Sequence, residues 1–334
     1  GTACRRATDA RATGPTAAER TESHFLHVAI PELHALKRTM PVPNRFAVLP
    51  LVLAVLPTAC TDGPPVFEPV PQPSCTQEGV GGFACSGIDL VGFVSIAALG
   101  GSGGARMNDL WGWTDPVTGA EYGLVGRSDA AVFVDVSDPS APRVVGELPM
   151  TAGASASSWR DLKVYADHVF IVSDGAGAHG MQVFDLTRLR NLGNAPVKFD
   201  ADALYTDIAS AHNIVVDTES GFAFAVGARQ GGTTCGGGLH MIDVRNPESP
   251  TFAGCFADAQ TGRASTGYSH DAQCVTYTGP DADYRGREIC LGANETALSI
   301  ADVTDKDNPI AVARASYPNV GYTHQGWLTE DQRY

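Results

Sequence analysis

Basic residues are scarce in this 334-residue chain, which has 23 Lys and Arg against 37 Asp and Glu and a formal net charge of −14. That balance argues against a nucleic-acid-binding surface, because phosphate recognition needs clustered Lys and Arg. No cysteine pair has the CxxC spacing of a zinc site. The apolar run at residues 46–56 is too short for a comfortable transmembrane helix. The chain is instead rich in turn formers, with 37 Gly and 21 Pro, as many short elements joined by turns require.

The first 84 residues are predicted to be processing and tether sequence. Residues 1–39 are rich in Ala, Arg and Thr without periodicity, and we interpret them as an over-extended gene start. Residues 40–60 have the layout of a secretory signal peptide, with a basic residue, the apolar run and small residues before Cys60. The ending resembles a lipoprotein signal with an acylated Cys60; Pro57 departs from the usual lipobox, and a plain signal peptide is the alternative. Residues 61–84, Pro-rich at their start, suit an extended tether.

Eight cysteines are present, and six of them predict disulfides. Cys4 lies in the leader and Cys60 is the lipidation candidate, which leaves an even set in a chain expected to be exported. Their positions relative to the expected strands and loops favour three pairs, which are Cys75–Cys85, Cys235–Cys255 and Cys274–Cys290. The last pair is centred on an expected hairpin, so its two residues should face each other across antiparallel strands.

Residues 85–334 contain a repeat in two registers. An Asp that follows a β-rich run and precedes a turn, a Pro and a further β-rich run recurs at spacings of 50, 58 and 59, as Asp135, Asp185, Asp243 and Asp302. A second phrase starts at spacings of 52, 52, 58 and 54, at Asn108, Arg160, His212, His270 and His324. Each copy divides into four short β segments, which in the fourth copy are 270–278, 287–293, 297–303 and 310–316. Tandem four-stranded repeats without helices predict an all-β fold, a β-propeller of antiparallel blades, with a β-sandwich array as the competitor.

The repeat period also predicts an incomplete ring. Residues 85–334 hold about four and a half blades, and the last copy stops inside or just after its first strand. Residues 88–99 have no blade of their own, so they are expected to supply the outer strand of the last blade. We expect a native ring of roughly six to eight blades, truncated here at its C-terminal end.

Two phrases carry a resemblance to a known family. The run DLVGFVSIAALGGSGGARMNDLWGWTDPVTGAEYGLVG, followed by VFVDVSDPSAPRVVGELP, resembles the choice-of-anchor B family of bacterial surface proteins. The Val-Asp-Val-Ser-Asp-Pro phrase is similar to LVIVD repeats. The resemblance covers about residues 85–334 and implies a β-propeller in the bacterial cell envelope or outside the cell. It implies no particular reaction.

The candidate site follows from the propeller geometry, in which the first strand of each blade lines the central channel. His212, His270 and His324 begin three successive blades at the same register, so we expect them to converge. Together with Asp161 they form a candidate site for a divalent metal such as Zn or Cu. The alternative, to which we give more weight, is that these side chains bind loop backbone and set the entry to each blade. The other polar residues expected on this ligand-binding face are Asp109, Arg127, Arg160, Asp174, His179, Arg229, Asp271 and Glu295.

Turns on the opposite face carry several carboxylates, such as Asp302, Asp305 and Asp307, which could indicate calcium. Because the turn recurs with varied carboxylates, capping of the turn by Asx side chains is the favoured interpretation. The tryptophans near the first strands, Trp111, Trp113 and Trp159, are expected to pack between blades rather than stack on carbohydrate.

These features favour an exported protein that is attached to the membrane only through a lipid anchor, or is secreted. We expect it to act as a binding or interaction module for an unidentified surface ligand or protein. The alternative is a metal-assisted envelope enzyme, a hydrolase or oxidase, that uses the His-lined face.

Overall fold

The computed structural model describes Cys75 and residues 84–334. The predicted leader, the signal-like segment with Cys60 and most of the tether lie outside the described residues. The chain divides into two units, Gly1–Cys60 and Thr61–Tyr334, and the described residues belong to the second. This part is all-β and consists mainly of four sheets, each of which contains four antiparallel strands that pair in chain order.

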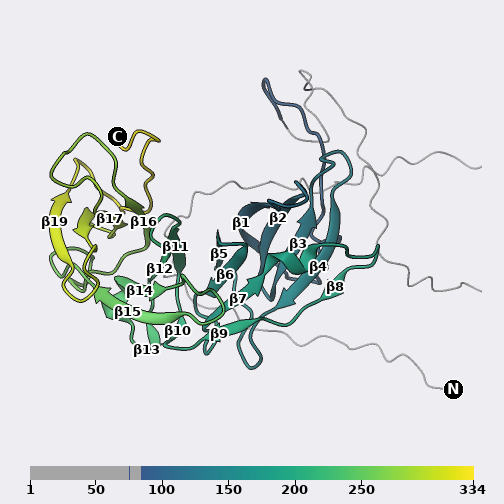
Figure 1. Cartoon of the computed structure of the whole chain (residues 1–334), viewed down its shortest axis with the longest axis horizontal. Helices are drawn as coiled ribbons and strands as arrows, with labels where there is room; N and C mark the ends of the chain where they lie inside the picture. The colour runs from purple at the N-terminus through teal and green to yellow at the C-terminus, as the bar shows by residue number, and fades with distance from the viewer. Residues whose placement is uncertain (1–74, 76–83) are drawn as a thin grey trace, which may run out of the picture. The chain divides into compact units, whose positions relative to one another are not determined.

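The four sheets follow one another along the chain (Figure 1). Sheet 1 consists of β1 (Met107–Thr114), β2 (Glu121–Arg127), β3 (Ala130–Asp135), β4 (Arg143–Pro149) and β8 (Val197–Lys198). Sheet 2 consists of β5 (Arg160–Tyr165), β6 (His168–Ser173), β7 (Met181–Asp185) and β9 (Ala203–Tyr205). Sheet 3 consists of β11 (Asn213–Asp217), β12 (Phe222–Val226), β14 (Leu239–Asp243) and β15 (Thr251–Phe256). Sheet 4 consists of β16 (Asp271–Thr276), β17 (Glu288–Ala293), β18 (Leu298–Asp302) and β19 (Ile310–Ala315).

Four smaller elements lie outside the four sheets. Strands β10 (Ile208–Ser210) and β13 (Gln230–Gly232) form a two-stranded antiparallel pair. Two short 3₁₀ helices, η1 (Leu186–Leu189) and η2 (Cys235–Gly237), occupy turns after β7 and before β14. No helix in the described part of the chain is long and apolar enough to cross a membrane.

The strands of sheet 4 match the segments expected from the sequence to within two residues at each end. The agreement arises because apolar, β-rich runs are separated there by turn-forming residues such as the Asp-Lys-Asp-Asn-Pro run at 305–309. The expected register is also present, since Cys274 and Cys290 lie directly opposite each other in the β16–β17 ladder.

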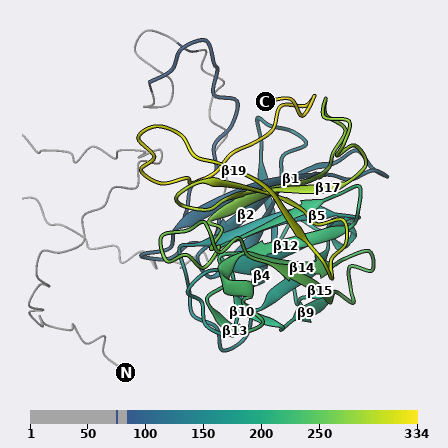
Figure 2. The ribbon, with the colours of Figure 1, turned by 90° about the vertical axis from the view of Figure 1, so that its left-hand side faces the viewer.

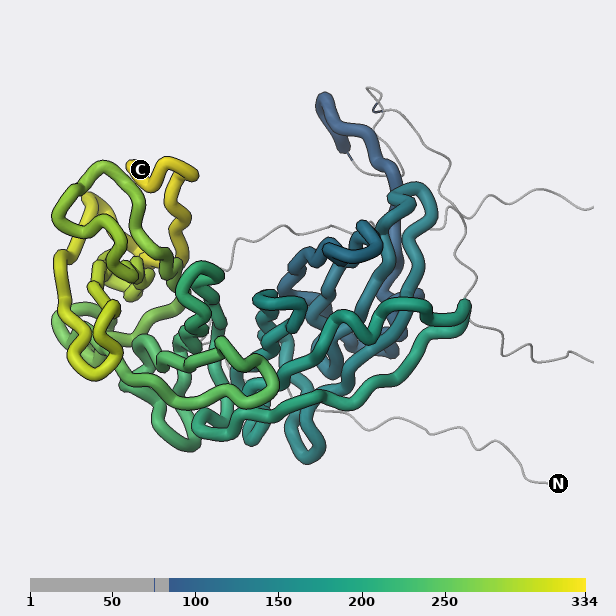
Figure 3. Tube along the Cα trace, in the orientation of Figure 1, coloured from purple at the N-terminus to yellow at the C-terminus, as the bar shows by residue number. Residues whose placement is uncertain are grey.

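The run after Pro196 departs from the expected pattern. The sequence assigns it to the fourth strand of the second copy, but in the structure it is β8, which pairs in parallel with β4 of sheet 1. Figure 1 labels both strands, and Figure 3 traces the chain in the same orientation. The next residue, Phe199, packs with Phe133 and Phe184 between sheets 1 and 2. Gly146 of β4 makes room for it, because a Cβ atom there would lie 2.5 Å from the Phe199 ring. The fourth strand of sheet 2 is β9 instead.

Residues 88–99, expected to supply the outer strand of the last blade, form no strand beside the four sheets that the structure describes. A turn closes at Leu99, whose amide donates to the Ser95 carbonyl oxygen. Leu99 and Val94 pack against Val132 and Val134 of sheet 1. The residues after β19 contain no strand among those described. A bridge joins Thr323 to Glu295, and hydrogen bonds join Leu328 to Gln273 and Gln332 to Thr278.

Apolar cores lie between consecutive sheets. One cluster joins sheets 1 and 2 around Phe133 and Phe184, a second joins sheets 2 and 3, and a third joins sheets 3 and 4. The first strands of neighbouring sheets are in contact, β1 with β5, β5 with β11, and β11 with β16. Sheets 2 and 3 are therefore covered on both faces.

The outermost strand of sheet 4 is exposed along most of its length. Figure 2 views the molecule from the side on which β19 lies. All but one of the residues of β19 are exposed, and Ile310 at its start is 60% exposed.

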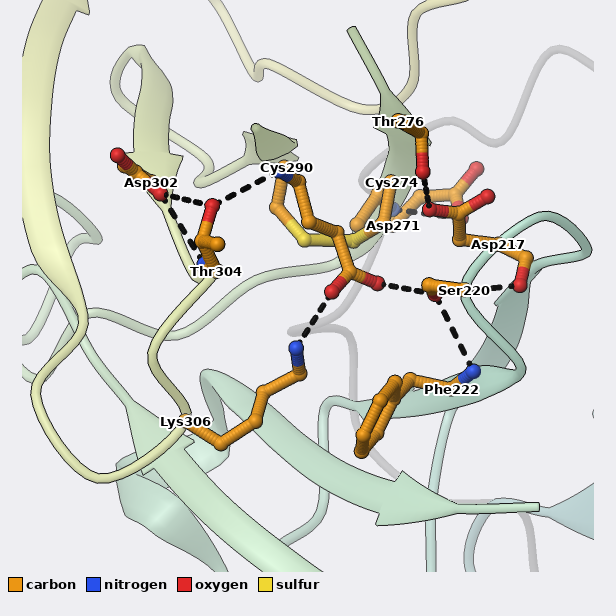
Figure 4. The surroundings of a disulfide bond; sticks show 12 residues. Asp217, Ser220, Phe222, Asp271, Cys274, Thr276, Cys290, Asp302, Thr304 and Lys306 are labelled. Atoms are coloured by element: carbon orange, nitrogen blue, oxygen red, sulfur yellow. Dashed lines mark hydrogen bonds and ion pairs between the residues drawn. A yellow bond between two sulfur atoms is a disulfide. The ribbon is translucent and has the colours of Figure 1, made fainter. Parts of the chain in front are cut away.

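The described residues contain three disulfides, which are the three predicted pairs: Cys75–Cys85, Cys235–Cys255 and Cys274–Cys290. The third lies on the face of sheet 4 that packs against sheet 3. Figure 4 shows Asp217, Ser220 and Lys306 beside it. Glu288 lies in the same region, where its carboxylate accepts a hydrogen bond from Ser220 at 2.7 Å and pairs with Lys306 at 2.5 Å. Thr276 donates to Asp217.

Candidate functional site

Three histidine rings lie next to one another at the starts of the first strands. The ring centroids of His212 and His270 are 4.3 Å apart, and those of His270 and His324 are 3.9 Å apart. Trp159 extends the row beyond His212 at 5.6 Å, and Tyr322 meets His270 edge-on at 5.4 Å. We call these five residues the aromatic strip. The equal register of the three histidines in successive repeats is what brings their rings together.

The hydrogen bonds of two strip histidines fix their tautomers. Nδ1 of His212 lies 2.9 Å from a carboxylate oxygen of Asp174, and Nδ1 of His270 lies 3.0 Å from the carbonyl oxygen of His324. Carboxylate and carbonyl oxygens only accept, so both Nδ1 atoms carry the proton and donate. Burial, together with the neighbouring His212 and His324, lowers the pKa of His270 to about 4. His270 is therefore neutral at pH 7, with a lone pair on Nε2.

Charged side chains lie around the strip. Burial raises the pKa of Asp174, but its hydrogen bond and charge interaction with His212 outweigh burial, so the pKa lies below the ordinary value. Burial raises the pKa of Asp271. Arg229, which is exposed, lies over the Tyr268 ring at 4.8 Å.

The loop of Glu295 borders the strip on its other side. Glu295 accepts a hydrogen bond from the Arg263 amide and is joined to Thr323 by two backbone hydrogen bonds. The guanidinium of Arg263 lies over the Tyr322 ring at 4.8 Å. Burial is the main reason that the pKa of Tyr322 lies above its ordinary value.

Asp161, the expected carboxylate partner of the histidines, is used elsewhere. Its side chain is buried, accepts a hydrogen bond from the Ile214 amide at 2.6 Å and pairs with Lys163 at 2.7 Å. Asp109 pairs with the same lysine at 3.3 Å. Burial and the adjacent Asp109 raise the pKa of Asp161 well above its ordinary value. This cluster belongs to the interface between first strands, and it supports the structural interpretation for Asp161.

Hydrogen bonds between a side chain of one first strand and the backbone at the start of the next cross all three interfaces between neighbouring sheets. Asn108 donates to the Arg160 carbonyl and Asp109 accepts from the Leu162 amide, which joins sheet 1 to sheet 2. The Ile214 amide bond to Asp161 joins sheet 2 to sheet 3, and Asn213 joins sheet 3 to the start of sheet 4 through the carbonyl of His270. We call these contacts the inter-sheet clamps.

Three residues expected on the ligand-binding face lie in the interior instead. Arg127, Arg160 and His179 are 5%, 0% and 0% exposed. Arg127 binds the Leu99 carbonyl, Asp129 and Glu147, while Arg160 donates to the Arg127 carbonyl and to Nε2 of His179 at 2.8 Å. Burial and the charge of Arg160 lower the pKa of His179 to about 4, and burial lowers that of Arg160 to about 10. These side chains anchor sheets 1 and 2 rather than meet a ligand.

The tryptophans divide into two groups. Trp113 is buried, stacks on Tyr122 at 5.3 Å and donates to Asp167, and Trp111 is packed beside the core between sheets 1 and 2. Trp159 is 50% exposed and lies at the end of the aromatic strip. The sequence predicts that Trp159 packs between blades, whereas the structure places it in the candidate site. Tyr322 and Arg263 carry no repeat signal, because they lie in loops outside both repeated phrases.

The repeated aspartates form Asx turns. In every sheet the Asp at the end of the third strand accepts a hydrogen bond from the amide two residues later, at 2.9–3.1 Å, and these residues are Asp135, Asp185, Asp243 and Asp302. Asp305 likewise accepts from the Asp307 amide. The capping interpretation explains these turns without an ion.

Among the described residues, three His, Cys, Asp or Glu side chains bring their ligand atoms within 4.8 Å of one another at one place, His168, Asp185 and Glu248. The three histidines of the aromatic strip do not form such a group. Their rings lie side by side instead, tilted by 57° between His212 and His270 and by 42° between His270 and His324.

Comparison with known proteins gives distant likenesses. No family model and no curated protein matches the chain. A functionally unknown protein from Desulfotomaculum acetoxidans is 11% identical over 63% of this chain and 57% of its own, with a TM-score of 0.39. The β-propeller domain of Cps50 (Swd1) from Myceliophteria thermophila is 9% identical over 60% of this chain and 56% of its own, with a TM-score of 0.35. The chain thus matches less than two thirds of either structure.

Proposed function

We propose that sheets 1–4 are blades of a β-propeller. The observation that supports this architecture is the serial packing of the sheets, in which each core lies between consecutive sheets and the first strands contact one another. A two-sheet sandwich would cover one face of each sheet, whereas sheets 2 and 3 are covered on both. Radially arranged blades have this property, with first strands nearest the axis.

The outer faces of sheets 1 and 4 are consistent with the same architecture. Leu110 and Val125 line an open apolar groove on sheet 1, and Leu110 is 63% exposed. Leu291, Ile300 and Ala313 lie side by side on the outer face of sheet 4, where they line a second groove. In a propeller both faces are covered by further four-stranded blades.

We propose that the protein is a binding module that contacts its ligand through the aromatic strip. The observation that carries this proposal is the row of Trp159, His212, His270, Tyr322 and His324. It combines exposed ring surface at Trp159 with a neutral histidine and with two arginines at its borders, Arg229 and Arg263. Aromatic and arginine side chains are the residue types that dominate binding energy in interfaces.

We further propose that the protein is exported. Three disulfides suit an oxidising compartment. The signal-like residues 40–60 and the resemblance to choice-of-anchor B proteins with LVIVD repeats support a cell-envelope location, with acylated Cys60 as the lipid anchor.

The binding proposal is tested with matched tryptophan variants. The chain is screened against immobilised glycan and peptide libraries by surface plasmon resonance. Trp159→Ala should weaken binding to the best probe at least tenfold, while Trp327→Ala, which removes a 70% exposed tryptophan outside the strip, should leave it unchanged. A His212→Ala/His270→Ala variant should lose binding as well. Equal weakening in both tryptophan variants, or full binding by the histidine variant, contradicts the proposal.

A metal-assisted enzyme is the second candidate, and one observation favours it. His212 is oriented by a carboxylate through Nδ1, as metal-ligating histidines usually are, and this leaves its Nε2 to bind an ion. Zn or Cu that is retained by the wild-type chain and lost specifically in His212→Ala/His270→Ala would support the enzyme. Hydrolase or oxidase activity would have to disappear in the same variant.

A further inference from the structure

A second group of potential ligands lies away from the aromatic strip, where sheet 2 meets sheet 3. His168 begins β6 and faces Asp185 at the end of β7, because the two residues are directly opposite in the antiparallel ladder. Glu248 comes from the β14–β15 turn of sheet 3, which is closed by a hydrogen bond between Ser249 and Asn246. The ligand atoms of the three side chains all lie within 4.8 Å of one another.

The imidazole of His168 is prepared to donate a lone pair. Its Nδ1 lies 2.7 Å from the carbonyl oxygen of Ala166, so Nδ1 carries the proton and Nε2 does not in the neutral ring. Nε2 is buried and has no hydrogen-bond partner among the described residues. It faces Glu248, whose Oε1 is 3.9 Å away. A buried acceptor without a hydrogen bond is costly, so its orientation toward two carboxylates requires an explanation.

The repeat shows that His168 is an exception. The residue opposite the repeated aspartate is Tyr122 in sheet 1, Phe222 in sheet 3 and Ile289 in sheet 4. Only in sheet 2 is it one of the residue types that ordinarily ligate zinc. Phe222 is instead covered by the cationic side chains of Arg245 and Lys306.

Asp185 is an exception in the same sheet. The equivalent aspartates each pair with an arginine, Asp135 with Arg143, Asp243 with Arg245 and Asp302 with Arg287. Among the described residues Asp185 has no Arg or Lys within 4.0 Å; Oδ1 of Asp185 accepts from the Thr187 amide, as the other repeat aspartates do. The missing cation and the substituted histidine therefore occur together, and Glu248 adds a second negative charge.

We propose that His168, Asp185 and Glu248 bind a divalent transition-metal ion, zinc, which joins sheet 2 to sheet 3. One imidazole nitrogen and two carboxylates are suitable ligands for zinc, and water completes its coordination. Tetrahedral zinc places its ligand atoms about 3.4 Å apart at ordinary bond lengths. The separation of 3.9 Å between His168 and Glu248 needs little closure, and Glu248 is exposed enough to move. The proposal does not depend on the function of the aromatic strip.

The test measures zinc binding by the whole chain after removal of metal with a chelator. Isothermal titration with Zn²⁺ should show one saturable site, and the melting temperature should rise with the logarithm of the Zn²⁺ concentration above Kd. Co²⁺ in place of Zn²⁺ should give the visible absorption of a low-symmetry site with nitrogen and oxygen ligands.

Two variants separate metal binding from folding. His168→Phe installs the residue that stands at the same position in sheet 3, so the chain should fold and bind Zn²⁺ more than about a hundredfold more weakly, since even an outer-shell change costs about 10- to 100-fold. Glu248→Gln, at an exposed position, should weaken binding at least about tenfold. The His212→Ala/His270→Ala variant should retain this zinc site. Absence of saturable Zn²⁺ binding by the wild-type chain, or equal binding by wild type and a folded His168→Phe, overturns the proposal.

Discussion

Acid should weaken this fold through His179 in particular. Its ring is fully buried between a backbone carbonyl and a guanidinium: Nδ1 donates to Gly180 and Nε2 accepts from Arg160. A second proton would have to enter on Nε2, where it would face the Arg160 cation. Burial of the ring, followed by the charge of Arg160, lowers the pKa of His179 from 6.5 to about 4 in the folded chain.

The size of the effect follows from that difference. Because the folded-state pKa lies below the unfolded value, the unfolded chain binds the proton first as the pH falls. The contribution of neutral His179 to stability is therefore complete above pH 6.5 and is lost as the pH falls toward 4. A difference of about 2.5 pKa units corresponds to about 3 kcal/mol in total. About 2 kcal/mol of this should be lost between pH 7.5 and pH 5.

The assay compares urea unfolding of wild type and His179→Gln at pH 7.5, 6, 5 and 4.5. Glutamine keeps an oxygen acceptor for Arg160 but cannot titrate, so its stability should fall less steeply between pH 7.5 and 5, by about 2 kcal/mol. Titration of the carboxylates is common to both chains and cancels in the difference. If both chains lose stability in parallel, His179 is not the titrating group and the reasoning is refuted.

Three further predictions concern packing, charge and covalent links. Gly146→Ala should cost about 1–3 kcal/mol by urea unfolding, since its Cβ would meet Phe199 and the Val197 carbonyl, while Gly112→Ala, where nothing lies within 4 Å, should change stability by less than about 0.5 kcal/mol. Lys306→Met should lower the free energy of unfolding by about 3 kcal/mol because it leaves the carboxylate of Glu288 buried without its cationic partner. The double variant Glu288→Gln/Lys306→Met should lose less stability than Lys306→Met alone, and an equal loss would contradict this cause. Replacing Cys274 and Cys290 by Ala should lower the free energy of unfolding by about 3 kcal/mol, as expected for a closed loop of 16 residues. Dithiothreitol should therefore destabilise this variant less than it destabilises the wild-type chain.

The sequence predicted the strands well where the chain alternates apolar runs with Asp- and Pro-containing turns. Sheet 4 has its four strands where the pattern placed them, because turn chemistry is local and determines where a strand ends. The cysteine pairs follow from the same reasoning, since a hairpin centre determines which residues face each other.

The sequence failed where distant packing decides the structure. Residues 197–198 follow the pattern of the fourth strand of their own repeat. In the structure Phe199 packs over Gly146 in sheet 1, and the adjoining residues 197–198 therefore pair with β4 instead. No local pattern reports a contact between residues about fifty positions apart.

The candidate site shows the same division. Equal register predicted that His212, His270 and His324 would lie close together, and their rings are adjacent. Whether a polar side chain faces solvent depends on neighbours that register does not specify. Arg160 and His179 bind each other in the interior, and Asp161 binds Lys163 rather than a histidine.

The inter-sheet clamps have a consequence for how the chain unfolds. Each clamp satisfies a backbone group of the next first strand with a side chain of the one before, so an isolated sheet would leave polar groups and an apolar face uncovered at once. The stability of such an array is approximately the sum of an intrinsic term for each sheet and a nearest-neighbour term for each interface. Cooperativity therefore resides in the interfaces, and a single broken clamp, such as that of Asp161, should divide one unfolding transition into two.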